Sequence, residues 1–407
     1  MICPFCSLLC DADDPNELKC ERRSVSLVKF RALRAAKGSQ KQAVLNEIDE
    51  SQESEYVDRL QIATKSLLHA KRILVTGRIA NVATARAAVA FAAKYNATID
   101  CAESGHAFKN ILAIQRSGLN SVSLAEARDH TDLFIVVGID SMQAAIPRMP
   151  FALRTGNPRR QTLLLLGEFS PASTEVWQQA GFDVWSVPCD LMTVPSALAQ
   201  WSRWSGSNPV SSITNTSLSN PLFAQMAQAQ YTTVVWSVEN IAMDQADLWV
   251  ERLLQWIANR NETTRCAALP WSSMDATFQQ VCTWLTGFPG RVAFQDGVPS
   301  YDPQRNSYEH WIARTSADNS AESAIVLIDE TVAATPYFDS IAMRDSGVNT
   351  VIELTGNSER FPTAIAGVET SADMFRADQM LLAHVTPSNN PGAYLKSAAS
   401  WLEGLSK

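Results

Sequence analysis

Residues 72–100 read RILVTGRIANVATARAAVAFAAKYNATID and decide the fold class. The first six residues form a short β-rich run that Gly77 closes. The alanine-rich segment ATARAAVAFAAKYN follows with the composition of a helix, and a second strand ends near Asp100. A strand, a helix and a strand in this order predict a βαβ unit, in which the helix crosses over one face of a parallel pair.

The other strand candidates are continuous apolar runs without alternation. They are LFIVVG (133–138), TLLLLG (162–167), DVWSVP (183–188), TTVVWS (232–237), RVAF (291–294), AIVLID (324–329) and TVIELTG (350–356). Such runs are typical of parallel strands with helices on both faces, so we expect an α/β protein with doubly wound, Rossmann-like sheets. Ligands of these folds bind beyond the carboxyl ends of the strands, at and after Gly77, Gly138 and Gly167 here.

Length and charge narrow the class of protein. A chain of 407 residues is long enough for two or three domains. The formal net charge of −8 and the lack of a long basic run argue against a nucleic-acid partner. The start of the sequence lacks the pattern of a signal peptide, and no stretch approaches eighteen uninterrupted apolar residues. We therefore expect a cytoplasmic protein without a membrane partner.

Half of the eight cysteines lie in the opening MICPFCSLLCDADDPNELKC. Cys3, Cys6, Cys10 and Cys20 form a C-x2-C-x3-C set with a fourth, more distant member. In a reducing compartment this spacing favours a metal site over disulfides, and four thiolates suit either a [4Fe-4S] cluster or zinc. Free thiols on a loose terminus are the alternative. The remaining cysteines are expected to be small buried apolar residues, at positions 101, 189, 266 and 282.

No common catalytic motif is present elsewhere. The five histidines are scattered, and neither a Walker A motif nor a complete G-x-G-x-x-G motif occurs. The turn TGRIANVATA follows a strand and opens a helix, yet its single glycine makes it a weak phosphate cradle. Tryptophans are frequent anchors of protein interfaces, with core packing as the commoner alternative. The candidates are Trp201, Trp204, Trp236, Trp249 and Trp256.

Blocks in the same order along the whole chain resemble a known family. CPFCSLLCD and LKCERRSVSLVKF resemble its cluster-binding opening, and ATID followed by ILAIQRSGLNSVSLAEARDHTDLFIVVG resembles the stretch around its catalytic residue. WLTGFPGRVAFQDGVPSYDP and AGVETSADMFRADQM resemble two later blocks. The family is the B subunit of formylmethanofuran dehydrogenase, a tungsten/molybdenum-pterin protein related to formate dehydrogenases. The chain is still more similar to a shortened bacterial relative, the B subunit of the formyltransferase/hydrolase complex.

The chain departs from the family pattern at its metal ligand. Ten residues separate ID from ILAIQ, and His106 occupies the position of the family's metal-ligating cysteine or selenocysteine. A neutral imidazole does not supply the charge of a soft thiolate ligand, so formate-level redox chemistry is not expected there.

Two loops of the family's pterin site differ as well. After VVG the chain reads IDSMQAAIPR, in which Asp140 and Ser141 replace Asn-Pro, Ile146 replaces His, and Pro147 and Arg148 persist. An anionic Asp140 would repel a pyrophosphate. The family's glycine-rich loop is replaced by PWSSMDATFQQVC. The resemblance therefore implies degenerate pterin loops at Gly77, Asp140 and Arg148, with no Mo/W-pterin bound and no catalytic residue.

The resemblance implies a largely non-catalytic subunit in tetrahydromethanopterin-linked one-carbon metabolism. Its partners would be a formyltransferase, an amidohydrolase-like hydrolase and further subunits, with a methanofuran-like carrier nearby. The alternatives are an active Mo/W-pterin oxidoreductase subunit, and a free-standing zinc-binding protein. The implied architecture is a cysteine-rich head (1–50), a first α/β domain (51–138 and 310–407) and a second, inserted α/β domain (139–309).

Overall fold

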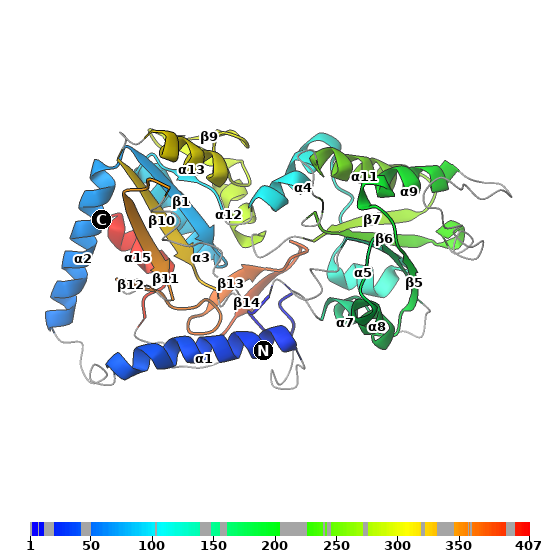
Figure 1. Ribbon diagram of the computed structural model, residues 1–407, viewed down its shortest axis with the longest axis horizontal. Coiled ribbons are helices and arrows are strands. Elements are labelled where there is room, and N and C mark those ends of the chain that lie inside the picture. Colours follow the sequence, from blue (N-terminus) through cyan, green and yellow to red (C-terminus); the bar gives the residue numbers. More distant parts are fainter. Residues whose placement is uncertain are drawn as a thin grey trace. The chain divides into compact units, whose positions relative to one another are not determined.

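The computed structural model describes most of the chain. The described residues are 2–6, 8–11, 20–41, 50–101, 104–138, 148–154, 161–203, 226–238, 241, 246–271, 276–318, 322–331, 346–356, 358, 360–387 and 395–407, with the backbone alone for 33, 35–41, 50–56 and 200–203. They divide into two compact units, Met1–Ser104 with Ser273–Lys407 and Gly105–Ser272. Each unit is built on its own sheet (Figure 1). None of the described helices is both long enough and apolar enough to cross a membrane.

The first unit contains a seven-stranded sheet in the order β12-β11-β10-β1-β2-β8-β9. Its strands are β1 (Arg72–Arg78), β2 (Thr98–Ile99), β8 (Val292–Gln295), β9 (Val298–Tyr301), β10 (Ser323–Asp329), β11 (Thr350–Thr355) and β12 (Phe361–Pro362). A separate hairpin pairs β13 (Ala372–Phe375) with β14 (Leu382–Val385). The helices are α1 (Glu21–Lys41), α2 (Glu50–His69), α3 (Val82–Lys94), α12 (Ala276–Thr286), α13 (Tyr308–Ala317) and α15 (Ala398–Leu405).

Helices cover both faces of this sheet, as the strand pattern predicts. Ile73 and Val75 point to one side, where they pack in a core with residues of α3, α12 and α15. Leu74 points to the other side and packs with Trp311 of α13. Both faces of β1 are therefore buried, which explains why its sequence is a continuous apolar run.

The second unit contains a five-stranded, all-parallel sheet in the order β5-β4-β3-β6-β7. Its strands are β3 (Leu133–Val137), β4 (Thr162–Leu166), β5 (Asp183–Val187), β6 (Tyr231–Trp236) and β7 (Arg265–Pro270). The helices are α4 (Ser104–Ser117), α5 (Leu124–His130), α7 (Met149–Leu153), α8 (Pro171–Gln179), α9 (Val194–Arg203) and α11 (Ala246–Arg260), with a 3-10 turn, η2 (Leu191–Thr193). This strand order is the doubly wound one, so the predicted fold class is confirmed.

The borders between the units differ from those expected. The expected border at 138/139 assigned β3 to the first domain, but β3 pairs with β4 and β6 in the second unit. The expected border at 309/310 assigned α12, β8 and β9 to the second domain, but β8 pairs with β2 in the first unit. The chain crosses at the start of α4 and again near Ser273. The arrangement is still one unit inserted into another.

One strand of the first sheet is not parallel. The RVAF segment forms β8, which runs antiparallel to both β2 and β9. The two residues between β8 and β9, Asp296 and Gly297, have φ of 51° and 76°. Positive φ at both central positions is the mark of a tight hairpin turn, and Asp-Gly is a strong sequence signal for it. The segment QDGV (295–298) therefore carries a sequence signal for this hairpin at the edge of the sheet.

Tryptophans of the second unit lie in its core. Trp236, Trp249 and Trp256 are 0%, 4% and 5% exposed. These three are therefore not interface anchors: core packing, the commoner alternative, holds for them, and they lie between the sheet and α9 and α11. The side chain of Trp201 and the whole of Trp204 lie outside the described residues.

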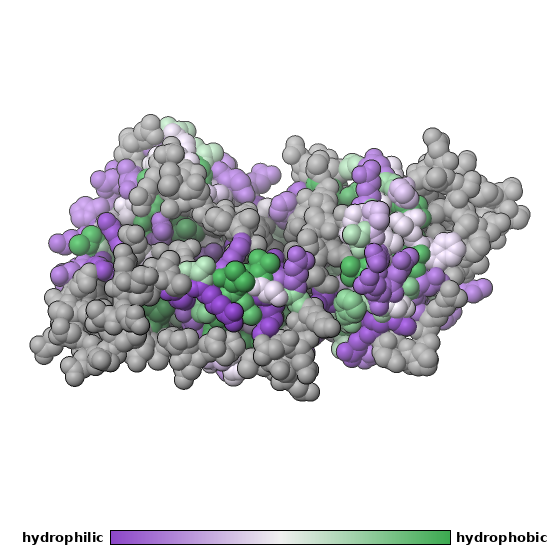
Figure 2. All heavy atoms as spheres, turned by 60° about the horizontal axis from the view of Figure 1, so that its bottom comes forward, coloured by the Kyte–Doolittle hydropathy of each residue, from purple (hydrophilic) through white to green (hydrophobic). Residues whose placement is uncertain are grey.

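The first unit does expose apolar side chains. Helix α1 runs along the lower side of Figure 1, and Figure 2 turns that side forward to show apolar surface among strongly polar residues. On α1 itself, Val25 and Val28 are 41% and 64% exposed. The inner side of the same helix buries Phe30, so α1 contacts the unit on one face and presents a mixed surface on the other.

Candidate functional site

The carboxyl edge of the first sheet is the place where its fold would bind a ligand. From β1 the chain proceeds to β2 on one side, whereas β10 lies on the other side. The two neighbours therefore flank a topological switch point at the carboxyl ends of β1 and β10. Arg78 ends β1 and forms an ion pair with Asp329, which ends β10, at 3.7 Å. Glu330 follows directly.

Gly77 lies inside strand β1, in register with Ile328 of β10. Its φ is +132°, and a Cβ at this position would lie 1.8 Å from the carbonyl oxygen of Ile328. This glycine is therefore required for the two strands to pair closely, and its conformation is one that other residues rarely adopt. It belongs to the packing of the sheet rather than to a loop that approaches a ligand.

Glu330 is a buried carboxyl group beside the start of helix α3. It is 1% exposed, and its Oε1 accepts a hydrogen bond of 2.6 Å from the hydroxyl of Thr84. Burial raises its pKa to about 7, against the opposing effect of Thr84 and of the backbone N–H groups of Asn81 and Ala80. No feature of the local sequence singled out this residue.

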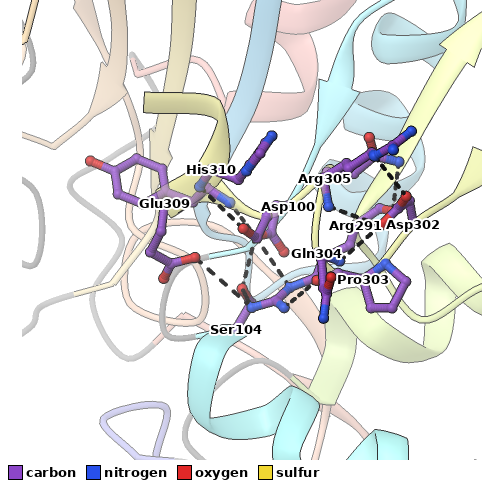
Figure 3. Close-up of polar contacts among 12 residues, drawn as sticks. Asp100, Ser104, Arg291, Asp302, Pro303, Gln304, Arg305, Glu309 and His310 are labelled. Atoms are coloured by element: carbon purple, nitrogen blue, oxygen red, sulfur yellow. Dashed lines mark hydrogen bonds and ion pairs between the residues drawn. The ribbon is translucent and has the colours of Figure 1, made fainter. Parts of the chain in front are cut away.

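A second buried carboxyl group lies after β2 and is shown in Figure 3. Asp100 is fully buried, and its Oδ2 accepts hydrogen bonds of 2.8 Å from the hydroxyl of Ser104 and from the backbone N–H of Tyr308. The Nε of Arg291 lies 3.7 Å from the same oxygen. Arg291 also donates to Ser104 Oγ at 3.1 Å and to the carbonyl of Pro303 at 2.5 Å.

This network joins two of the sequence blocks that resemble the family. Asp100 ends ATID, while Arg291 and Pro303 belong to the WLTGFPGRVAFQDGVPSYDP block. Burial is the largest influence on Asp100 and raises its pKa to about 7, although Arg291 opposes the rise. Arg291 itself adopts φ of 52°. The network holds Ser104, the first residue of α4, in place. Its role is structural, because it fixes the segment at which the chain passes from the first unit to the second.

His106 lies on the exposed side of α4, in the second unit, while its neighbours Ala107 and Phe108 are buried. The structure thus places the residue at the expected ligand position on a helix surface. Within the described ranges, no group of three or more His, Cys, Asp or Glu residues is arranged to hold a metal ion.

The second sheet has its own switch point, between β3 and β6. Gly138 and Gly167 follow β3 and β4, and both have positive φ. A Cβ on Gly138 would lie 3.1 Å from a methyl group of Leu191, and one on Gly167 would lie 2.8 Å from the other methyl group. The carbonyl of Leu191 accepts a hydrogen bond of 2.7 Å from the indole of Trp249. An apolar side chain therefore covers the two glycines that a ligand would otherwise approach, which does not fit a phosphate-bearing group there.

The loop expected to carry Asp140, Ser141, Ile146 and Pro147 lies outside the described residues. Arg148 is described: it directly precedes α7, and its guanidinium carbon lies 5.8 Å from the ring centroid of Phe151.

The four N-terminal cysteines gather in one loop and the start of α1. The backbone N–H of Cys3 donates to the carbonyl of Cys10 at 2.9 Å, and that of Leu9 donates to Cys6 at 3.2 Å. Cys3, Cys6 and Cys20 are buried, and Cys10 is half-buried. Burial above all, and then proximity to the other three thiols, raises the pKa of Cys6 to about 12. Four thiols are the ligand type that an Fe-S cluster or zinc requires. In the described structure, however, the four side chains are not arranged as a group that could hold a metal ion, so the ligand set stays a prediction.

The other cysteines mostly match their predicted role. Cys101, Cys266 and Cys282 are buried, and Cys189 is half-buried.

The cysteine loop rests on the segment before the β13–β14 hairpin. Gly367, with φ of +72°, approaches Pro4 so closely that a Cβ would lie 2.7 Å from the Pro4 Cβ. Phe5 and Phe30 pack with Ile365 and Val368 in a small core. The docking is reinforced by Arg34 of α1, whose guanidinium Nε donates to the buried carboxylate of Glu369 at 2.6 Å.

Gly367→Val should detach the cysteine loop while leaving the seven-stranded sheet intact, because the added Cβ would lie 2.7 Å from Pro4 and 2.9 Å from Val385 of β14, both outside that sheet. We expect the buried thiols to react with a thiol reagent about tenfold faster, which corresponds to about 1.4 kcal/mol of lost protection. Gly118→Val is the matched control, since it has a similar φ of +74° and open space around its Cβ position. Equal thiol reactivity in both variants would contradict the docking described here.

No family model matches the chain. The chain is 21% identical to the B subunit of the tungsten-containing formylmethanofuran dehydrogenase 2 of Methanococcus maripaludis, over 93% of this chain and 91% of that protein. The predicted resemblance is confirmed. A chain of the formyltransferase/hydrolase complex FhcABCD from Methylorubrum extorquens, a crystal structure in complex with methylofuran, has a similar fold with a TM-score of 0.68. The match has 18% sequence identity and covers 89% of this chain and 96% of that chain.

Proposed function

We propose that this chain is a largely non-catalytic, structural subunit of a formyltransferase/hydrolase complex in tetrahydromethanopterin-linked one-carbon metabolism. In this role it supports the transferase and hydrolase subunits, lines the path of a methanofuran-like carrier, and works in the cytoplasm. The observation that carries the proposal is the match in fold to a chain of such a complex, which extends over 96% of that chain. A match of that extent leaves little of the neighbour's architecture without a counterpart here.

Three features support the absence of redox catalysis. His106 stands on a helix surface at the position of the metal-ligating cysteine or selenocysteine. Leu191 covers Gly138 and Gly167 at the switch point of the second sheet, and the Glu330 carboxyl group lies at the switch point of the first. Phosphate-bearing cofactors of doubly wound folds are held at these edges. Leu191 and Glu330 occupy space that a pterin dinucleotide would need there.

For the N-terminal cysteines we propose a structural metal, as a [4Fe-4S] cluster or zinc held by Cys3, Cys6, Cys10 and Cys20. A metal there would stabilise a loop that otherwise depends on a small core.

One observation favours a second function. The curated relative is named as part of a tungsten-containing dehydrogenase, and it aligns over 93% of this chain. If this chain kept that activity, His106 or a neighbouring residue would have to bind the metal in place of a thiolate. Tungsten or molybdenum bound in stoichiometric amount would support this second function.

The surface that we assign to the hydrolase partner lies where α12 meets the β13–β14 hairpin. Trp284 is 56% exposed and its ring contacts that of Phe375, with centroids 5.5 Å apart. Phe375 is paired with Leu382 across the hairpin. The exposed apolar members of this patch are Trp284, Leu285, Met380, Leu381 and Leu382. Exposed tryptophans surrounded by apolar residues are typical anchors of protein interfaces.

Two pairs of polar side chains beside the patch bind each other. Gln280 donates to Gln379 at 2.8 Å, and Arg376 donates to Asp378 at 2.5 Å. The surface therefore presents apolar area rather than free charge, which suits a protein partner better than a charged carrier.

Trp284→Ser should weaken capture of the hydrolase subunit when a tagged chain is purified from its native host. A central interface tryptophan contributes on the order of 2 kcal/mol or more, so capture should fall about 30-fold or more. Leu248→Ser serves as the control, because Leu248 is 47% exposed on α11 in the other unit. Purification of the unmodified chain without any transferase or hydrolase subunit would contradict the proposed function.

A further inference from the structure

Helix α3 begins at the switch point of the first sheet, directly after β1. Its N-cap is Asn81, whose side chain accepts a hydrogen bond of 3.2 Å from the backbone N–H of Ala83. The preceding turn and this first helical turn direct N–H groups toward the space beyond β1, where a positive partial charge accumulates. In βαβ folds this is the position at which a ligand phosphate is bound.

Glu330 occupies that space from the neighbouring strand. Its carboxyl group accepts from Thr84 in the first turn of α3, and it also interacts with the backbone N–H groups of Ala80 and Asn81. The backbone of Glu330 is fixed on both sides, since its N–H donates to Arg78 O at 3.4 Å and its carbonyl accepts from Ala366 at 3.1 Å. The backbone of Glu330 is therefore held at the carboxyl edge of the sheet.

The carboxyl group is buried and incompletely satisfied. Glu330 is 1% exposed, and its Oε2 has no hydrogen-bond partner among the described residues. The neighbouring Asp329 carries the same sign and raises the pKa of Glu330 further. Burying an acidic group without a cation is costly, and the hydroxyl of Thr84 and the positive end of α3 offset part of this cost.

We propose that Glu330 is an internal anion that fills the phosphate site of the first βα turn. Its Oε1 accepts from the hydroxyl of Thr84, and the N–H groups of Ala80 and Asn81 and the positive end of the α3 dipole lie beside it. This is the kind of setting that holds a phosphate in nucleotide-binding relatives of the fold. Removal of the carboxylate therefore opens a site for inorganic phosphate or pyrophosphate. The inference does not depend on the partner subunits proposed above.

The test is phosphate binding to the full-length chain at pH 7.5 and constant ionic strength. By equilibrium dialysis with labelled inorganic phosphate, we expect Glu330→Ala to bind about one equivalent per chain and the unmodified chain to bind none. The melting temperature of Glu330→Ala should rise with phosphate and saturate, since a ligand that binds only the folded state stabilises it by mass action. Asp329→Ala is the matched control, because it removes a neighbouring carboxylate that Thr84 does not contact.

Two further variants distinguish the effect of the space left by the Glu330 side chain from the effect of the groups that bind an anion. Glu330→Gln fills the site with a neutral side chain and should bind no phosphate. Adding Thr84→Val to Glu330→Ala should weaken phosphate binding about tenfold, because it removes one donor to a charged group.

If Glu330→Ala is unfolded in phosphate-free buffer, phosphate should restore its folding. The proposal is wrong if Glu330→Ala binds no phosphate when folded, if phosphate fails to restore an unfolded variant, or if the unmodified chain or Asp329→Ala binds equally well.

Discussion

Gly77→Val should prevent the first unit from folding. The new Cβ would lie 1.8 Å from the carbonyl oxygen of Ile328, and neither backbone can yield because the two residues are paired in the centre of the sheet. The backbone φ of +132° adds strain for a β-branched residue. Together these effects exceed about 4 kcal/mol, a large share of the stability of an ordinary domain. We expect aggregated protein, or a melting transition from which the first unit is missing.

Gly287→Val provides the control for backbone strain. It lies in the same unit with φ of +85° and has nothing within 4 Å of its Cβ position. We expect it to remain folded at a cost of about 1 to 2 kcal/mol. Similar melting temperatures for the two variants would contradict the close pairing of β1 and β10.

Arg291→Met should be the most destabilising change that adds no new backbone strain. It leaves Asp100 buried without its guanidinium partner and breaks the contacts of Arg291 to Ser104 and Pro303. Breaking a buried charged pair from one side typically costs about 3 to 5 kcal/mol. Asp100→Asn in the same chain should recover much of this loss, because the amide can still accept from Ser104 without carrying a charge. The measurement is a double-mutant cycle on the free energy of unfolding.

The loss of stability caused by Arg291→Met should increase as the pH rises. Burial raises the pKa of Asp100 from 3.8 to about 7, so the folded chain binds a proton that the unfolded chain has released. The associated stability is fully present below about pH 4 and is lost as pH rises to about 7. Arg291 lowers this pKa, so Arg291→Met raises it further and extends the loss to higher pH. The variant should therefore be more destabilised at pH 8 than at pH 6, and a flat difference would show that Asp100 is not its partner.

Much of the fold was readable from the sequence. Continuous apolar runs such as LFIVV and TLLLL predict parallel strands, and both lie fully buried in the five-stranded sheet. The antiparallel edge of the first sheet was missed because RVAF is as apolar as its neighbours, although the Asp-Gly turn after it indicates a hairpin. The borders between the units differ from those expected because local sequence does not reveal which sheet β3 joins.

The candidate site was less predictable. The spacing of Cys3, Cys6 and Cys10 indicated a common loop, and in the structure these thiols and that of Cys20 lie near enough to influence the pKa of Cys6, without forming a group that could hold a metal ion in the described part of the chain. Glu330 and Leu191 were missed, because each acts on an element distant in sequence: Glu330 on the start of α3, and Leu191 on Gly138 and Gly167. Local composition carries no signal for such contacts. The nearest sequence signal is an acidic residue that directly follows a buried parallel strand. Both Asp100 and Glu330 have such a position.

We propose that this chain keeps the fold of a metallopterin subunit without its redox centre. Elemental analysis by mass spectrometry of the chain, purified anaerobically with its partners, tests this most directly. We expect tungsten, molybdenum and pterin to be absent, and iron or zinc to be present in an amount that one set of four cysteines can hold. Stoichiometric tungsten or molybdenum together with a bound pterin would contradict the account.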